Sequence, residues 1–75
     1  MIHADEKYNR IQDPDGIIPD DEPVFLLRAQ DCHAVFAVAE WLTRYKGSPY
    51  DPEKAKRVHD HMELMDKWIV KKIPD

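Results

Sequence analysis

The sequence has few of the residues that form cross-links, phosphate-binding loops or nucleophilic centres. Cysteine occurs once in 75 residues, which excludes an internal disulfide. Glycine occurs twice, so no glycine-rich phosphate loop is present. Cys and His do not recur at zinc-finger spacing, and no serine or cysteine nucleophile motif occurs. These absences predict a protein with no catalytic residues, no metal site and no cofactor.

Long apolar runs and a basic excess are also lacking. No segment approaches the ~20 apolar residues that a membrane-spanning helix needs, and the first residues lack the basic and apolar regions of a signal peptide. The 11 basic residues are outnumbered by 15 acidic ones, for a net charge of −4. Proteins that bind duplex nucleic acid usually carry a basic excess. We therefore expect a cytoplasmic protein that binds neither membranes nor duplex nucleic acid.

The length of the chain predicts one domain, residues 1–75, with little stability of its own. The burial of a core of this size exceeds the entropy cost of folding by only a small free energy. Since disulfides and zinc are excluded, self-association is the remaining support. We expect a homo-oligomer, most simply a homodimer.

The first half of the chain predicts a tail followed by a hairpin and loop region. Residues 1–6 are mixed and without period, whereas residues 7–31 contain a strong turn signal in Asp13-Pro14-Asp15-Gly16. Residues 24–27 are an uninterrupted apolar run of strand length, entered through Pro23. The expected hairpin pairs Lys7 to Gln12 with Val24 to Arg28, and the apolar run should be covered on both faces.

The second half predicts two antiparallel helices. Apolar residues recur at helical spacing from residue 32 to 46 and from residue 52 to 72. The expected boundary signals are Asp31 and Asp51 as N-caps, Gly47 in a left-handed conformation after the first helix, and Pro74 as the stop for the second. The whole chain therefore predicts a small α+β domain, with the short hairpin packed on the antiparallel helix pair. An all-α fold, with the central run in an earlier helix, is the alternative.

Arg28 is expected to form a structural ion pair. It follows the apolar run directly, where an unpaired guanidinium would be costly to bury. The candidate partners are Glu22 and Asp31. Cys32 and His33 at the helix start are more simply unrelated neighbouring side chains than metal ligands. His59 and Glu63, four residues apart on a helix, are more simply a surface ion pair than part of a metal site.

The basic start of the second helix is the one candidate ligand site. Its lysine and arginine side chains lie near the positive end of the helix, beside two tyrosines across the connection. Such a set can hold a phosphate and stack a base, or it can be a solvated charged face. The expected ligand-binding residues are Tyr45, Tyr50, Lys54 and Arg57.

Large apolar side chains on both helices exceed what so small a domain can cover. Methionine adapts to irregular shapes and tryptophan anchors interfaces, although most such stripes form a core. The expected interface residues are Phe36, Trp41, Met62, Met65 and Trp68.

The segment from Asp13 to Asp31, DPDGIIPDDEPVFLLRAQD, resembles a family of short uncharacterised proteins encoded mostly in bacteriophage and prophage genomes. Members often have proline soon after the aspartate at the helix start, where this chain has Cys32 and His33. The resemblance implies a phage-linked accessory protein in the host cytoplasm and supplies no activity or catalytic residue.

Three functions remain open from the sequence. The first is a non-catalytic accessory protein that binds a host protein through an apolar helix surface, for example to counter host defence. The second is an oligomeric module that sequesters a small anionic, nucleotide-like ligand. The third is a structural component of the virion or of its assembly.

Overall fold

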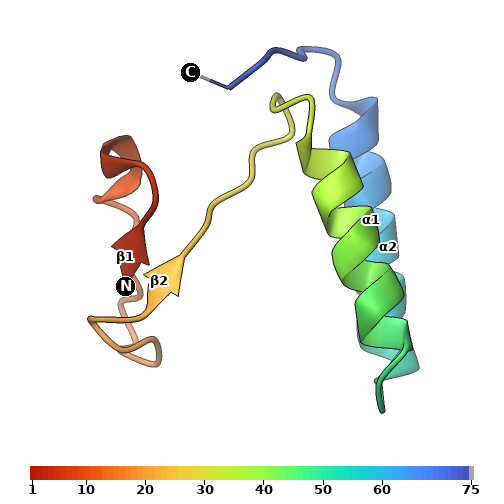
Figure 1. Cartoon of the computed structure of the whole chain (residues 1–75), viewed down its shortest axis with the longest axis horizontal. Coiled ribbons are helices and arrows are strands. Elements are labelled where there is room, and N and C mark those ends of the chain that lie inside the picture. Colours follow the sequence, from red (N-terminus) through yellow and green to blue (C-terminus); the bar gives the residue numbers. More distant parts are fainter. Residues whose placement is uncertain (75) are drawn as a thin grey trace.

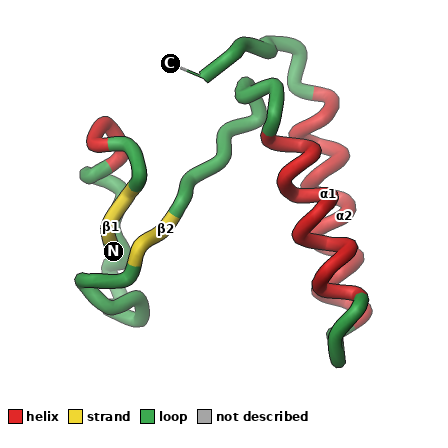
Figure 2. Tube along the Cα trace, in the orientation of Figure 1, coloured by secondary structure: helices red, strands yellow, loops and turns green. Residues whose placement is uncertain are grey.

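Two short strands lie at one side of the molecule and two long helices at the other. The computed structural model describes residues 1–74. The elements, in chain order, are β1 (Ile2–His3), the 3-10 helix η1 (Glu6–Tyr8), β2 (Pro23–Val24), α1 (Ala34–Lys46) and α2 (Pro52–Lys67). Figure 1 shows an arch, in which residues 1–24, here called the N-terminal lobe, and the helix pair are the two legs. Residues 25–33 form the link between them, without a helix or an extended sheet (Figure 2).

The sheet is parallel, so the expected hairpin is wrong. Ile2 pairs with Pro23 and His3 with Val24. The segment predicted as a strand begins instead inside η1, where Asp5 accepts a hydrogen bond from the Lys7 N–H at 3.1 Å. A capping aspartate stabilises the start of a helical turn locally, whereas strand pairing depends on a distant partner that periodicity does not identify. The α+β class holds in its coarse form, with a minimal sheet.

The predicted turn at Asp13 to Gly16 is confirmed. The Gly16 N–H donates to the Asp13 carbonyl at 3.2 Å, and the Asp13 carboxylate accepts from the backbone N–H groups of Asp15 and Ile18 at 3.1 and 2.8 Å. Gly16 has a φ of +67°, a conformation that costs glycine little. Asp13 therefore organises the loop that returns the chain toward β2.

The central apolar run is largely exposed, which corrects the expectation of a strand covered on both faces. Only Val24 belongs to β2, and Phe25 is 70% exposed. Leu26 is exposed and Leu27 half-buried. The strands and the helix pair lie in separate legs of the arch (Figure 1), so the expected packing of the sheet on the helices, which would have covered the run, is not formed.

The first helix begins at Ala34 rather than Cys32, and Asp31 is not its N-cap. The Asp31 carboxylate accepts from the His33 N–H at 2.8 Å, which closes a turn before the helix. His33 stands at the cap position without a side-chain cap. Gly47 ends the helix with φ −81°, which is right-handed, because its N–H continues the helical pattern to the Arg44 carbonyl. The expected left-handed glycine is therefore wrong.

The start of α2 is as expected, and its end is not. Asp51 accepts from the Glu53 N–H at 3.0 Å, and Pro52 occupies the first turn. The helix ends at Lys67, before the predicted limit at Lys72, and Trp68 is already extended. The chain leaves the helix because Lys72 pairs with the segment before α1: its N–H donates to Gln30 at 2.7 Å, and its carbonyl accepts from Cys32 at 3.0 Å.

The core lies between the two helices. α1 and α2 run side by side and pack against each other (Figure 1). The buried side chains are Ala34, Leu42, Ala55 and Met65. Alanine on each helix allows close approach but contributes little buried apolar area. Neither helix within residues 1–74 has the length and apolar content that crossing a bilayer requires.

Candidate protein-binding surface

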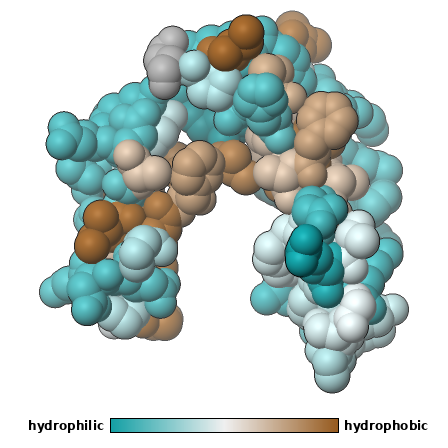
Figure 3. All heavy atoms as spheres, in the orientation of Figure 1, coloured by the Kyte–Doolittle hydropathy of each residue, from teal (hydrophilic) through white to brown (hydrophobic). Residues whose placement is uncertain are grey.

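Large apolar side chains gather at the end of the helix pair where α1 begins and α2 ends. Phe36 on α1 is 76% exposed, and Ile69, just beyond α2, is 92% exposed. Apolar atoms are visible on the surface over this end of the helices in Figure 3. We call this surface the apolar cap, and it consists of Phe36, Leu64, Trp68, Ile69 and Val70.

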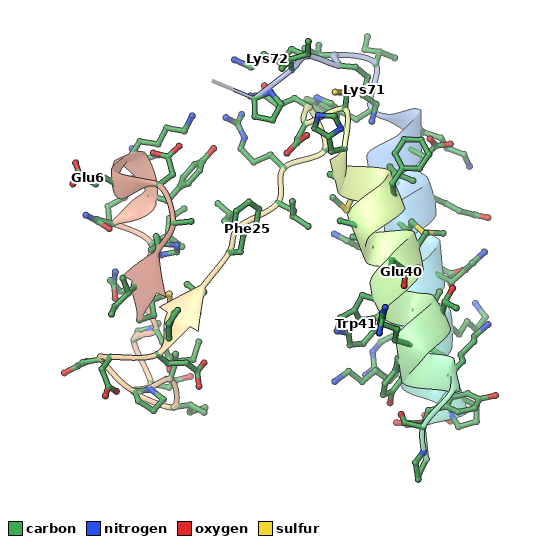
Figure 4. All side chains as sticks on the ribbon, viewed as in Figure 1. Glu6, Phe25, Glu40, Trp41, Lys71 and Lys72 are labelled. Carbon is green, nitrogen blue, oxygen red and sulfur yellow. The ribbon has the colours of Figure 1, made fainter. Side chains whose placement is uncertain are left out.

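The apolar cap is held on a fixed framework. The ammonium group of Lys71 donates to the Met65 carbonyl at 2.6 Å, which also accepts from the Trp68 N–H at 3.2 Å where α2 ends. The same group donates to the Ala29 carbonyl at 2.9 Å. Lys71 therefore ties the segment after α2 both to the helix and to the link before α1. Figure 4 shows it between these parts of the chain.

The predicted interface residues divide between core and surface. Met65 is only 9% exposed, and Met62 is half-buried. Both lie on the stripe of α2 that packs on α1, so Met65 does not present its side chain to a partner. Phe36 and Trp68 are exposed in the apolar cap. Leu64 lies beside the apolar stripe of α2, whereas Ile69 and Val70 lie beyond the helix end at Lys67, so the helical spacing that predicts Ile69 on the packed stripe is wrong there.

Three of the four predicted ligand-binding residues meet at the other end of the helix pair. Tyr45 stacks on Trp41, with ring centroids 4.9 Å apart, and contacts Tyr50 edge-on at 5.9 Å. The Lys54 ammonium lies 6.0 Å from the Trp41 ring and 5.7 Å from the Tyr45 ring. Trp41, expected in the interface, thus belongs to this aromatic group. Arg57 is exposed and joins no ring contact among the residues described.

This aromatic group stabilises the packing of the two helices. It is poorly suited to bind an anion. The Tyr45 hydroxyl accepts from the Asp51 N–H at 3.0 Å, which fixes the connection between α1 and α2. The carboxylates of Asp51 and Glu53 stand at the positive end of α2, and Asp51 already accepts one of its free N–H groups. The Lys54 charge faces aromatic rings. An incoming phosphate would therefore meet two carboxylates.

The predicted ion pair of Arg28 is not formed. Its guanidinium donates to the Tyr8 hydroxyl at 3.4 Å, and within residues 1–74 it makes no salt bridge with Glu22 or Asp31. Arg28 is exposed, so water can solvate its charge, and the Asp31 carboxylate accepts from His33 instead. Tyr8 and Arg28 form part of the lining of a cavity of about 250 Å³ between the N-terminal lobe and the link.

His59 lies beside two carboxylates on the surface of α2. Its Nδ1 is 3.6 Å from an Asp60 carboxylate oxygen, and its Nε2 is 3.7 Å from a Glu63 carboxylate oxygen. Asp60 also accepts a 2.7 Å hydrogen bond from Lys56, which lowers the pKa of the Asp60 carboxyl and raises that of the Lys56 ammonium. The ligand atoms of Asp31, Cys32 and His33 lie within 4.8 Å of one another, as expected for consecutive residues in a turn.

Comparison of the chain with protein-family models, with curated proteins and with solved structures finds no match.

Proposed function

We propose that this protein is a non-catalytic binding module that binds a host protein through the apolar cap. The observation that carries the proposal is the exposure of Phe36 and Ile69, at 76% and 92%, beside Trp68 on the same end of the helix pair. Large apolar side chains that are exposed together at one end of a small domain are typical of interaction sites. Aromatic side chains supply much of the binding energy when a partner excludes water from them.

The kind of partner follows from the segment between Asp13 and Asp31. Its resemblance to short phage and prophage proteins supports an accessory protein that acts in the host cytoplasm on a host component, such as a defence protein. The anionic-ligand alternative has less support, because Asp51 and Glu53 occupy the positive end of α2. A structural role in the virion would use the same cap against a phage protein.

Site-specific photo-crosslinking in host cells tests the proposal. A photoreactive phenylalanine analogue replaces Phe36 in one variant and Glu63 in a second. Glu63 is an exposed α2 residue outside the cap. We expect a discrete crosslinked product with a host protein from position 36 and none from position 63. In the variant with the probe at position 36, Ile69→Asp together with Val70→Asp should abolish capture while the helical circular dichroism persists, because both cap side chains are exposed. Equal crosslinking from both positions would contradict the proposal.

A further inference from the structure

A single chain leaves more surface exposed than a complete folded unit of its mass. It exposes 6146 Å² at 8.8 kDa, whereas a compact monomer of that mass exposes about 4,800 Å². Its radius of gyration is 14.0 Å, against about 11 Å for a compact chain of this length. The excess is roughly 1,300 Å², which exceeds the ~800 Å² per partner of a standard interface and is typical of obligate dimers.

The excess surface comes from the arch. The N-terminal lobe and the helix pair are each internally packed, and the space between the two legs is open in the space-filling view (Figure 3). Phe25 lies on the link above this opening, and Trp41 projects from α1 toward it (Figure 4). The arch is flat, with extents of 32 × 30 × 18 Å. Its broad faces are therefore the natural surfaces for a second molecule.

The two legs carry opposite charge at the mouth of the arch. Residues 1–22 contain seven acidic and two basic side chains, and they end in the exposed loop Asp20, Asp21 and Glu22. The tip of the helix pair, residues 44–57, contains five basic and two acidic side chains. Arg44 and Lys56 are paired with Glu40 and Asp60, so Lys46 and Arg57, which make no ion pair within residues 1–74, carry the positive charge that is open to a partner. The acidic loop and the basic tip lie at the free ends of the two legs (Figure 1). One chain thus carries both halves of a complementary pair on separate legs.

We propose that two copies form a reciprocal dimer in which the acidic lobe of each lies against the basic helix tip of the other. A two-fold axis running between the legs superimposes each lobe on the opposite helix tip when two flat arches stack face to face. Each chain then contributes the same two contacts, and opposite charges meet twice. This inference goes beyond the proposed function, because the apolar cap lies at the opposite end of the helix pair from the basic tip.

A charge exchange between two variants tests the dimer. Variant one carries Asp20→Lys and Asp21→Lys, and variant two carries Lys46→Glu and Arg57→Glu. All four side chains are exposed, and none makes a side-chain hydrogen bond or ion pair within the described chain, so the fold should persist. Each variant alone places like charges against one another. In a one-to-one mixture, opposite charges meet again at both contacts.

By sedimentation equilibrium, we expect each variant alone to dimerise at least about tenfold more weakly than the wild type, and the mixture to recover the wild-type affinity. Asp66→Lys, a charge reversal near the cap end of α2, is the matched control and should leave dimerisation unchanged. A mixture that associates no better than either variant alone, or variants that dimerise like the wild type, would overturn the reciprocal dimer. Crosslinking from position 36 should persist in both variants, so its loss would count against the proposed function instead.

Discussion

Asp31 and Lys72 form a parallel backbone bridge that joins the approach to α1 with the segment leaving α2. The Lys72 N–H donates to the Gln30 carbonyl at 2.7 Å, and the Cys32 N–H donates to the Lys72 carbonyl at 3.0 Å. The bridge closes the end of the helix pair that carries the apolar cap. It also explains why the chain leaves the helix after Lys67.

Removing the donor in this bridge should destabilise the fold. Lys72→Pro eliminates the N–H that bonds Gln30, while Lys72→Ala keeps it and serves as the control. In urea titrations, we expect the free energy of unfolding of the proline variant to be about 1–3 kcal/mol lower than that of the alanine variant. The reason is that the half-buried Gln30 carbonyl loses its donor. Equal stability of the two variants would show that the bridge contributes nothing.

Two leucines on the helix pair provide a matched test of the core. Leu42 is 6% exposed between the helices, and Leu64 is 66% exposed in the apolar cap. Leu42→Ala should lower the free energy of unfolding by about 2–5 kcal/mol through lost burial and a residual cavity. Leu64→Ala should change it by less than about 0.5 kcal/mol. Urea unfolding followed by tryptophan fluorescence measures both, and similar losses would contradict this placement of the core.

The loop at Asp13 should make a contribution to stability that depends on pH. The backbone hydrogen bond from Ile18 lowers the pKa of the Asp13 carboxyl below its ordinary 3.8, with further help from Asp15. A carboxyl whose pKa is lowered in the folded state stabilises that state above the unfolded value and loses this contribution as pH falls through the folded value. An NMR titration should place the Asp13 midpoint below 3.8, and Asp13→Asn should lack this acid-dependent loss. A midpoint at or above 3.8 would refute the assignment.

Features that depend on neighbouring residues could be predicted from the sequence. The Asp51 cap with Pro52, the turn at Asp13 to Gly16 and the apolar stripes of the two helices all follow from side chains within a few positions of one another. The grouping of Tyr45 and Tyr50 with Lys54 can also be predicted, because a short connection brings them together. The role of this group in stabilising the helix pair cannot be predicted, since it depends on the ring of Trp41 and on the Asp51 N–H.

Features that depend on distant pairing could not be predicted. The β1 and β2 strands are two residues each and pair across the whole N-terminal lobe, so no periodic pattern marks them. The end of α2 depends on the bridge from Lys72 to Asp31, far away in the chain. The sequence predicts a carboxylate partner for Arg28 because the apolar run before it has the pattern of a buried strand. Since Phe25 is 70% exposed, the electrostatic reason for that pair disappears.

The central claim is that contact with another protein chain completes this fold, and the concentration dependence of mass and stability tests it most directly. Sedimentation equilibrium at micromolar concentration should give twice the 8.8 kDa chain mass. The urea midpoint should rise with protein concentration, because dissociation accompanies unfolding of a dimer. A mass of 8.8 kDa at every concentration up to the millimolar range, together with a cooperative unfolding midpoint independent of concentration, would contradict the claim.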